Sequence, residues 1–130
     1  MRILSSPNQN ERKNGVKPSF LIMHYTGTKS AQEAEDYYIG AGQASPHFMI
    51  DEDGAITQFV SLENRAWHAG VAYWNGITDL NSHSIGIECV NPGHEFGYRP
   101  FPLIQMEALA ALSQDLIRRF DIPATHKLPA

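Results

Sequence analysis

The chain has 130 residues, of which 42% are hydrophobic and 18% are charged, and its formal net charge is −4. This length is enough for one domain with a buried core and too short for two, so a single domain over residues 1–130 is predicted. The negative net charge gives no electrostatic basis for nucleic acid or an anionic membrane as a partner.

A single cysteine, Cys89, excludes an internal disulfide, so nothing requires an oxidising compartment. The N-terminus lacks the apolar run of a signal peptide, and no stretch approaches the roughly 20 apolar residues of a membrane-spanning helix. These features predict a cytoplasmic protein. A periplasmic protein would require that a leader had been removed before this N-terminus.

The first half of the chain predicts a strand followed by a helix. Residues 1–19 are expected to form an irregular N-terminal segment, because 5–19 are polar and rich in Asn, Lys and Pro. Residues 20–26 are apolar on both alternating faces, which favours a central strand covered on two sides. Ser30 and Glu33 have the spacing of a capping box, so a helix should begin there and end near Gly40.

The second half predicts a hairpin, a strand and a long helix. Residues 47–60 contain two apolar runs around Glu52-Asp53-Gly54, which is typical of a hairpin. Residues 61–83 have no clear period and predict a long loop. Residues 85–90 alternate as a strand does, and 103–120 follow helical spacing. The order indicates an α/β fold, with a central mixed sheet flanked by helices.

One carboxylate, Glu88, stands inside an otherwise apolar strand. An ionised carboxylate is costly to bury without partners, so Glu88 is expected to border a polar cleft. Gly86 beside it leaves room for a substrate or a water, and a base that activates water needs such a partly dry carboxylate. The alternative is a structural ion pair with Arg65 or Arg99.

Several histidines and a tryptophan could face the same cleft. His24 ends an apolar strand, where its side chain either projects into the cleft or bonds a backbone carbonyl in the core. Trp67 and His68 lie between small residues and could form a ligand wall, although Trp67 itself is expected to anchor its loop by filling the core. His47 begins a strand, and this position is more often structural.

Short motifs in a fixed order carry a resemblance to a known family; they span Met23–Thr26, Ala44–Ile50, Asp53–Gly54, Arg65–Gly70, Asn81–Glu88 and Asn91–Tyr98. The chain resembles the zinc-dependent N-acetylmuramoyl-L-alanine amidases of the type-2 group, which cleave the amide between muramic acid and L-alanine in peptidoglycan. The resemblance runs from about Ser6 to Pro123. Pro46 stands where another branch has a tyrosine, which favours the bacterial branch with a glutamate on the Ile-Gly-Ile-Glu strand.

The resemblance implies an amidase-like, peptidoglycan-recognition fold and a set of site residues. His24 would be the first zinc ligand, and Glu88 the general base acting on a zinc-bound water whose pKa the metal lowers to roughly 7. The residues expected to contact a muramyl-peptide are His47, Trp67, His68 and Asn81.

The resemblance departs at the C-terminus. The family's second histidine ligand, its aspartate or cysteine ligand and a catalytic lysine follow the last helix, in a segment of the form Gly-His-Ser-Asp-x-x-Pro-x-Arg-Lys. Here an ungapped register puts Ala130 at that histidine, and His126 lies nearby with no carboxylate after it. Catalytic zinc sites typically use three protein ligands, so a C-terminally truncated domain with an incomplete zinc site is expected.

The predicted function is that of an N-acetylmuramoyl-L-alanine amidase, and two alternatives to it stay open at this point. A truncated amidase would require that the gene continues into the missing ligands. A catalytically inactive muramyl-peptide-binding module would bind peptidoglycan fragments without zinc. A folded remnant would do neither. The sequence does not choose between an anhydro-muramyl-peptide and the intact wall as the substrate, and it does not give the oligomeric state.

Overall fold

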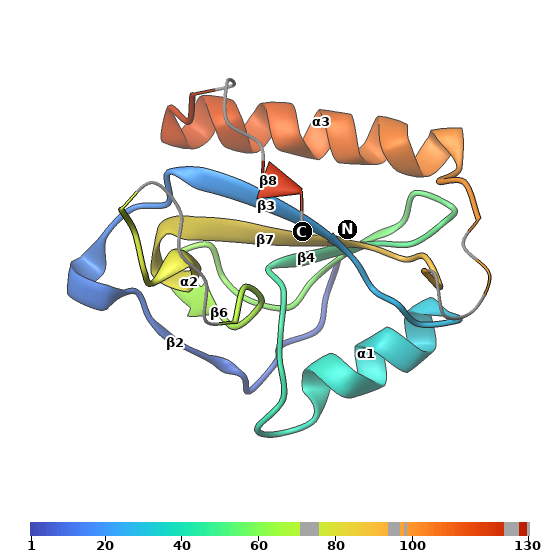
Figure 1. The fold of residues 1–130 in the computed structure, drawn as a ribbon, viewed down its shortest axis with the longest axis horizontal. Helices are drawn as coiled ribbons and strands as arrows, with labels where there is room; N and C mark the ends of the chain where they lie inside the picture. Colours follow the sequence, from blue (N-terminus) through green and yellow to red (C-terminus); the bar gives the residue numbers. More distant parts are fainter. Residues whose placement is uncertain (71–75, 94–96, 98, 124–127, 130) are drawn as a thin grey trace.

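The computed structural model describes residues 1–70, 76–93, 97, 99–123, 128 and 129. Within these ranges, six strands form one sheet in the order β1-β5-β4-β7-β3-β8 (Figure 1). Their bounds are β1 Arg2–Ile3, β3 Phe20–Tyr25, β4 Phe48–Ile50, β5 Ile56–Gln58, β7 Ser84–Cys89 and β8 Leu128–Pro129. The β4–β5 pair is antiparallel and the other pairs are parallel, so the predicted mixed sheet is confirmed.

Strands β3 and β7 are neighbours in the sheet and are its longest strands. They pair in parallel along their whole length, from Phe20 opposite Ser84 to Tyr25 opposite Cys89. Every residue of β7 is buried. Strand β3 lies between β7 and β8, and its first three residues are buried, so the strand predicted at 20–26 is confirmed over Phe20–Tyr25.

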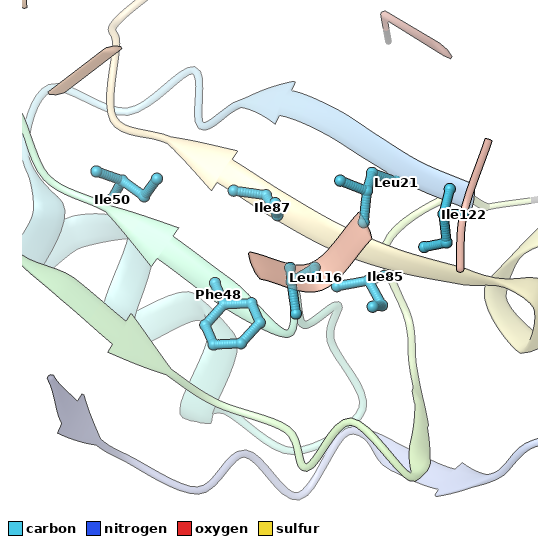
Figure 2. Close-up of a cluster of buried hydrophobic side chains, with 7 residues drawn as sticks. All are labelled: Leu21, Phe48, Ile50, Ile85, Ile87, Leu116 and Ile122. Atoms are coloured by element: carbon cyan, nitrogen blue, oxygen red, sulfur yellow. The ribbon is translucent and has the colours of Figure 1, made fainter. Parts of the chain in front are cut away.

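Helix α3, Leu103–Phe120, lies along one face of the sheet (Figure 1). Its Leu116 is fully buried and lies among side chains from β4 and β7, as Figure 2 shows for Phe48 and Ile85. The cluster on this face consists of Leu21, Phe48, Ile50, Ile85, Ile87, Leu116 and Ile122. The bounds predicted for this helix are confirmed. None of the helices in the described ranges is long and apolar enough to cross a membrane.

The opposite face is covered by smaller elements. Helix α1, Ala31–Ile39, begins at Ser30, whose hydroxyl accepts a hydrogen bond from the Glu33 amide at 3.2 Å, as the predicted cap requires. A two-stranded antiparallel ribbon joins β2, Gln9–Glu11, to β6, Asn64–Ala66. The short helix α2, Leu80–His83, contacts β6 and leads directly into β7.

The expected irregular surface segment and the expected long loop are both partly wrong. The N-terminal segment contains β1, β2 and a 3-10 turn at Lys13–Gly15, and its polar residues Asn8 and Arg12 are buried. The segment 61–83 contributes β6 and α2. Polar side chains are buried here because they bond backbone groups, a relation that a hydrophobicity pattern does not register.

Candidate active site

His24 and Glu88 lie opposite each other at the carboxyl ends of β3 and β7. Residues paired in register on neighbouring strands project from the same face, and adjacent strands lie only about 4.8 Å apart. That face is the one opposite α3. His24 is partly exposed, whereas the side chain of Glu88 is buried, with 8% of its residue surface accessible.

Glu88 is a buried carboxylate with an unpaired oxygen. Its Oε1 is inaccessible and has no hydrogen-bond partner among the described residues. Burial raises the pKa of Glu88 from 4.5 to about 8. The alternative reading as an ion pair is wrong for both candidates, because Arg65 bonds Asp79 at 2.9 Å and Arg99 bonds Glu52 at 2.7 Å.

His24 is hydrogen-bonded to another histidine. Its Nε2 lies 3.1 Å from Nδ1 of His68, and Nε2 of His68 lies 3.0 Å from Oγ of Ser84. Burial lowers the pKa of His24. Burial first, and then neighbours such as His24 and His47, hold the pKa of His68 well below its usual value. Both shifts favour the neutral imidazole, and the two rings meet edge to face.

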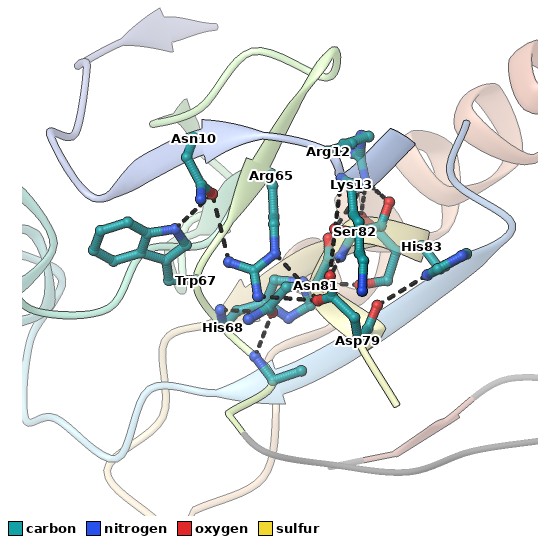
Figure 3. A network of polar contacts seen from close by, with 12 residues as sticks. Asn10, Arg12, Lys13, Arg65, Trp67, His68, Asp79, Asn81, Ser82 and His83 are labelled. Carbon is teal, nitrogen blue, oxygen red and sulfur yellow. Dashed lines mark hydrogen bonds and ion pairs between the residues drawn. The ribbon is translucent and has the colours of Figure 1, made fainter. Parts of the chain in front are cut away.

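The position of His68 depends on Gly86 and Asn81. A Cβ atom on Gly86 would lie 2.4 Å from Cγ of His68, so only glycine leaves the imidazole its place against β7. The buried Asn81 accepts hydrogen bonds on Oδ1 from the backbone amides of His68, at 3.1 Å, and Ala69, at 2.9 Å (Figure 3). Substrate contact by Asn81 stays a prediction, since its side-chain oxygen holds this loop.

His47 is fully buried next to Gly86. Its Nδ1 accepts a hydrogen bond from the Gly86 amide at 3.1 Å, and its Nε2 lies 2.9 Å from the carbonyl of Asn64. Nε2 therefore carries the proton and donates it to that carbonyl. Burial is the main reason that the pKa of His47 is lowered to about 4. These contacts support a structural role, and the muramyl-peptide contact expected for His47 stays a prediction.

Trp67 is partly exposed and tied to β2. Its Nε1 donates to Oδ1 of Asn10 at 3.0 Å (Figure 3). Its backbone amide donates to the hydroxyl of Ser45 at 3.2 Å. Trp67 does not belong to either buried apolar cluster, so the reading in which it fills the core is not supported. Its indole is anchored at one edge, which leaves ring surface for a ligand.

A polar network beside these residues was not found from the sequence. Arg65 donates to Oδ1 of Asp79 from Nε at 3.1 Å and from Nη2 at 2.9 Å, and Ser82 donates its hydroxyl to Oδ2 at 2.7 Å. Burial alone would raise the pKa of Asp79, but hydrogen bonds from Ser82 and Arg65 outweigh it and lower that pKa. Asp79 caps α2, and because aspartate is a preferred N-cap residue it is a signal that could have predicted this turn.

The described residues fit part of a zinc site. His24 offers an imidazole nitrogen, Nδ1, that makes no hydrogen bond within the described ranges, and the unpaired Oε1 of Glu88 suits a proton acceptor beside a cation. No three His, Cys, Asp or Glu side chains among the residues described are placed to hold a metal ion. His126, the other candidate ligand, lies outside the described residues.

Comparison with known proteins assigns the family. A family model described as N-acetylmuramoyl-L-alanine amidase matches residues 14–128. The chain belongs to this amidase family.

Two curated relatives and one solved structure illustrate the relation. The chain is 32% identical to the 1,6-anhydro-N-acetylmuramyl-L-alanine amidase AmpD of Citrobacter freundii, covering 92% of this chain and 71% of that protein. It is 33% identical to the N-acetylmuramoyl-L-alanine amidase AmiD of Escherichia coli K12, covering 78% of this chain and 41% of that protein. The solved complex of E. coli AmiD with anhydro-N-acetylmuramic acid-L-Ala-D-gamma-Glu-L-Lys superposes with a TM-score of 0.75 at 30% identity, over 88% of this chain and 49% of that one.

These comparisons confirm the predicted family and the amidase-like mixed α/β fold. The chain spans less than half of AmiD and about seven tenths of AmpD.

Proposed function

We propose that this chain acts as an N-acetylmuramoyl-L-alanine amidase that hydrolyses the amide between N-acetylmuramic acid and L-alanine in muramyl-peptides. The observation that carries the proposal is the pairing of His24 with Glu88, whose buried oxygen has no partner among the residues described. The relatives support the substrate class, because AmpD is named for an anhydro-muramyl amide and AmiD has been solved with an anhydro-muramyl tripeptide.

Zinc, when bound, would polarise the scissile carbonyl and acidify the attacking water. Among the described residues His24 is the one proposed to hold it. Glu88 would take the proton of the attacking water on Oε1 and deliver it to the amine that leaves as L-alanine. A general base works best when its pKa lies near the working pH, and a pKa of about 8 is close to that condition. A cation nearby would favour the ionised form.

Substitution of Glu88 tests the proposal. With an anhydro-muramyl-peptide as substrate, Glu88→Gln is expected to lower turnover by about 10²- to 10⁴-fold, since the amide cannot accept the proton. Release of the free peptide is measured by chromatography and mass spectrometry. Glu52→Gln is the matched control, because this carboxylate pairs with Arg99 on the surface and should leave turnover unchanged. Normal turnover in Glu88→Gln would contradict the role of base.

A second candidate is a module that binds muramyl-peptides without cleaving them. It is favoured by one observation, that the described residues bring no three metal-ligating side chains together. Calorimetric titration with an anhydro-muramyl-peptide, with and without a chelator, separates the two functions. Binding that is unaffected by the chelator, with no peptide released, would support the module and overturn the amidase.

A further inference from the structure

A hydrogen-bond chain of three side chains connects the proposed metal ligand, His24, to Ser84 at the start of β7. Ser84 Oγ, the His68 imidazole and the His24 imidazole follow one another at 3.0 Å and 3.1 Å. We propose that His68 is a positioning residue, which accepts the Nε2 proton of His24 and thereby leaves Nδ1 of His24 open as a lone pair. This inference rests on the proposed function for the use of that lone pair.

The number of protons on neutral rings allows two arrangements of donors and acceptors in this hydrogen-bond chain. A neutral imidazole carries one N–H donor and one acceptor nitrogen, while a hydroxyl can donate or accept. If Ser84 donates to His68, then His68 donates to His24, and the remaining proton of His24 blocks Nδ1. If His24 donates to His68, then His68 donates to Ser84, and Nδ1 of His24 is free to bind a metal.

The second arrangement matches what a metal-ligating histidine requires. Such a histidine nearly always donates its other ring N–H to a fixed acceptor, which sets its tautomer and the orientation of the ring. The acceptor is usually a carboxylate, a carbonyl or a water. Here the acceptor is an imidazole that lies 44 positions further along the chain.

His68 is held firmly enough to act in this way. Its backbone amide and that of Ala69 donate to the buried Oδ1 of Asn81, and its ring lies directly over the bare Cα of Gly86. On the far side of Gly86, His47 accepts a hydrogen bond from the Gly86 amide. Each of these contacts holds His68, or the glycine on which it packs, through a protein group.

The direct test is the proton position on each ring in the metal-free chain. Long-range ¹H–¹⁵N correlation spectra of the histidine-labelled protein distinguish protonated from bare ring nitrogens. We expect Nε2 protonated and Nδ1 bare on both His24 and His68. The reverse pattern, with Nδ1 protonated on both rings, would overturn the proposal. Neither result depends on amide hydrolysis, so a failure of the proposed function would be seen separately.

Substitutions at His68 test whether it sets the state of His24. His68→Leu removes the acceptor and is expected to give His24 a mixture of tautomers and to lower its zinc affinity about 10- to 100-fold. His68→Asn keeps an oxygen acceptor near the position of Nδ1, so it should restore most of the Nε2-protonated form. An unchanged His24 spectrum in His68→Leu would also overturn the proposal.

Two further variants keep the test decisive if His68→Leu does not fold. Ser84→Ala removes only the hydroxyl at the end of the hydrogen-bond chain. We expect a shift in the His24 ring signals of the same sign as in His68→Leu, but smaller. His83→Asn is the matched control, because Nδ1 of His83 bonds the Asp79 carbonyl at 2.9 Å and does not belong to the hydrogen-bond chain of Ser84, His68 and His24. A Ser84→Ala spectrum identical to that of His83→Asn at His24 would contradict the inference.

Discussion

The two faces of strand β7 are both buried, but against different kinds of side chain. Ile85 and Ile87 point toward α3, where they pack with apolar side chains from β3, β4 and α3. Ser84, Gly86 and Glu88 lie on the other face, where His68 contacts Ser84 and Gly86, and all six residues of β7 are buried. Burial alone therefore does not separate core from site. The chemistry of the neighbours does, because one face is stabilised by apolar packing and the other by directional hydrogen bonds that leave one carboxylate oxygen unpaired.

The largest effect is expected where the apolar face is emptied. Leu116→Ala should lower the free energy of unfolding by about 2–5 kcal/mol, because it leaves a cavity between α3 and the sheet. The measurement is chemical denaturation. Leu103→Ala is the control on the same helix, since Leu103 is 74% exposed and should change stability by about 0.5 kcal/mol or less. Equal losses in both variants would contradict the packing described for α3.

On the polar face, the expected effect is a pH dependence. The folded-state pKa of Glu88, about 8, lies above its usual value of 4.5, so the folded state holds its proton more tightly than the unfolded state. The stability of the metal-free chain should therefore fall between about pH 4.5 and 8, by up to about 1.4 kcal/mol per pH unit.

Glu88→Gln isolates this contribution. The variant should match the unsubstituted chain below pH 4.5 and exceed it in stability above pH 8, where the carboxylate is ionised and buried. Denaturant midpoints at a series of pH values give the comparison. Parallel pH curves for the two proteins would show that Glu88 is not desolvated in the way described.

A smaller loss of stability is expected when one residue on each face of β7 is substituted. Gly86→Ala places a methyl group against the His68 ring and is expected to cost about 1–3 kcal/mol and to shift the ring signals of His24. Ile87→Val, on the opposite face, is expected to cost about 0.5–1.5 kcal/mol with the His24 signals unchanged. A Gly86→Ala protein with increased stability and an unchanged His24 spectrum would contradict the close contact.

The smallest effect is expected on the outer side of α3. Asp115 and Arg119 lie one helical turn from each other, and Oδ2 of Asp115 is 3.9 Å from Nη1 of Arg119. Both side chains are about 60% exposed. Asp115→Asn should lower stability by about 0.5 kcal/mol or less, and less still at high salt. Thermal melts at low and high salt check this. A loss comparable to that of Leu116→Ala would mean that the helix is not held chiefly by its inner side.

The parts of the fold predicted from the sequence are those with a regular pattern. The apolar run at 20–26, the alternation at 85–90 and the helical spacing at 103–120 all correspond to observed elements. The turn signal at Glu52-Asp53-Gly54 correctly placed the hairpin. Each of these patterns depends on neighbours within a few positions of the chain, which a sequence displays directly.

The parts that were missed depend on contacts between distant residues. Nothing near Arg12 indicates that it is buried, because its partners are backbone carbonyls some 50 to 72 positions away. The bond between His24 and His68 likewise exists only once the sheet has formed. The motifs indicated that Glu88 and these histidines matter, but not that one histidine faces another or that Asn81 holds the loop.

The burial of Arg12 has a consequence for how the molecule opens. Its guanidinium donates to the carbonyls of Leu62, Ser82 and Ser84 at 2.9, 2.7 and 2.9 Å. One charged group thus connects the end of β2 to the segment before β6, to α2 and to the first residue of β7. Burial lowers the pKa of Arg12 only to about 10, so it stays charged while the histidines nearby are neutral. The segments that carry His68 and Glu88 are therefore expected to unfold together as one cooperative unit, and slow amide exchange there should be lost in a single step when this arginine is removed.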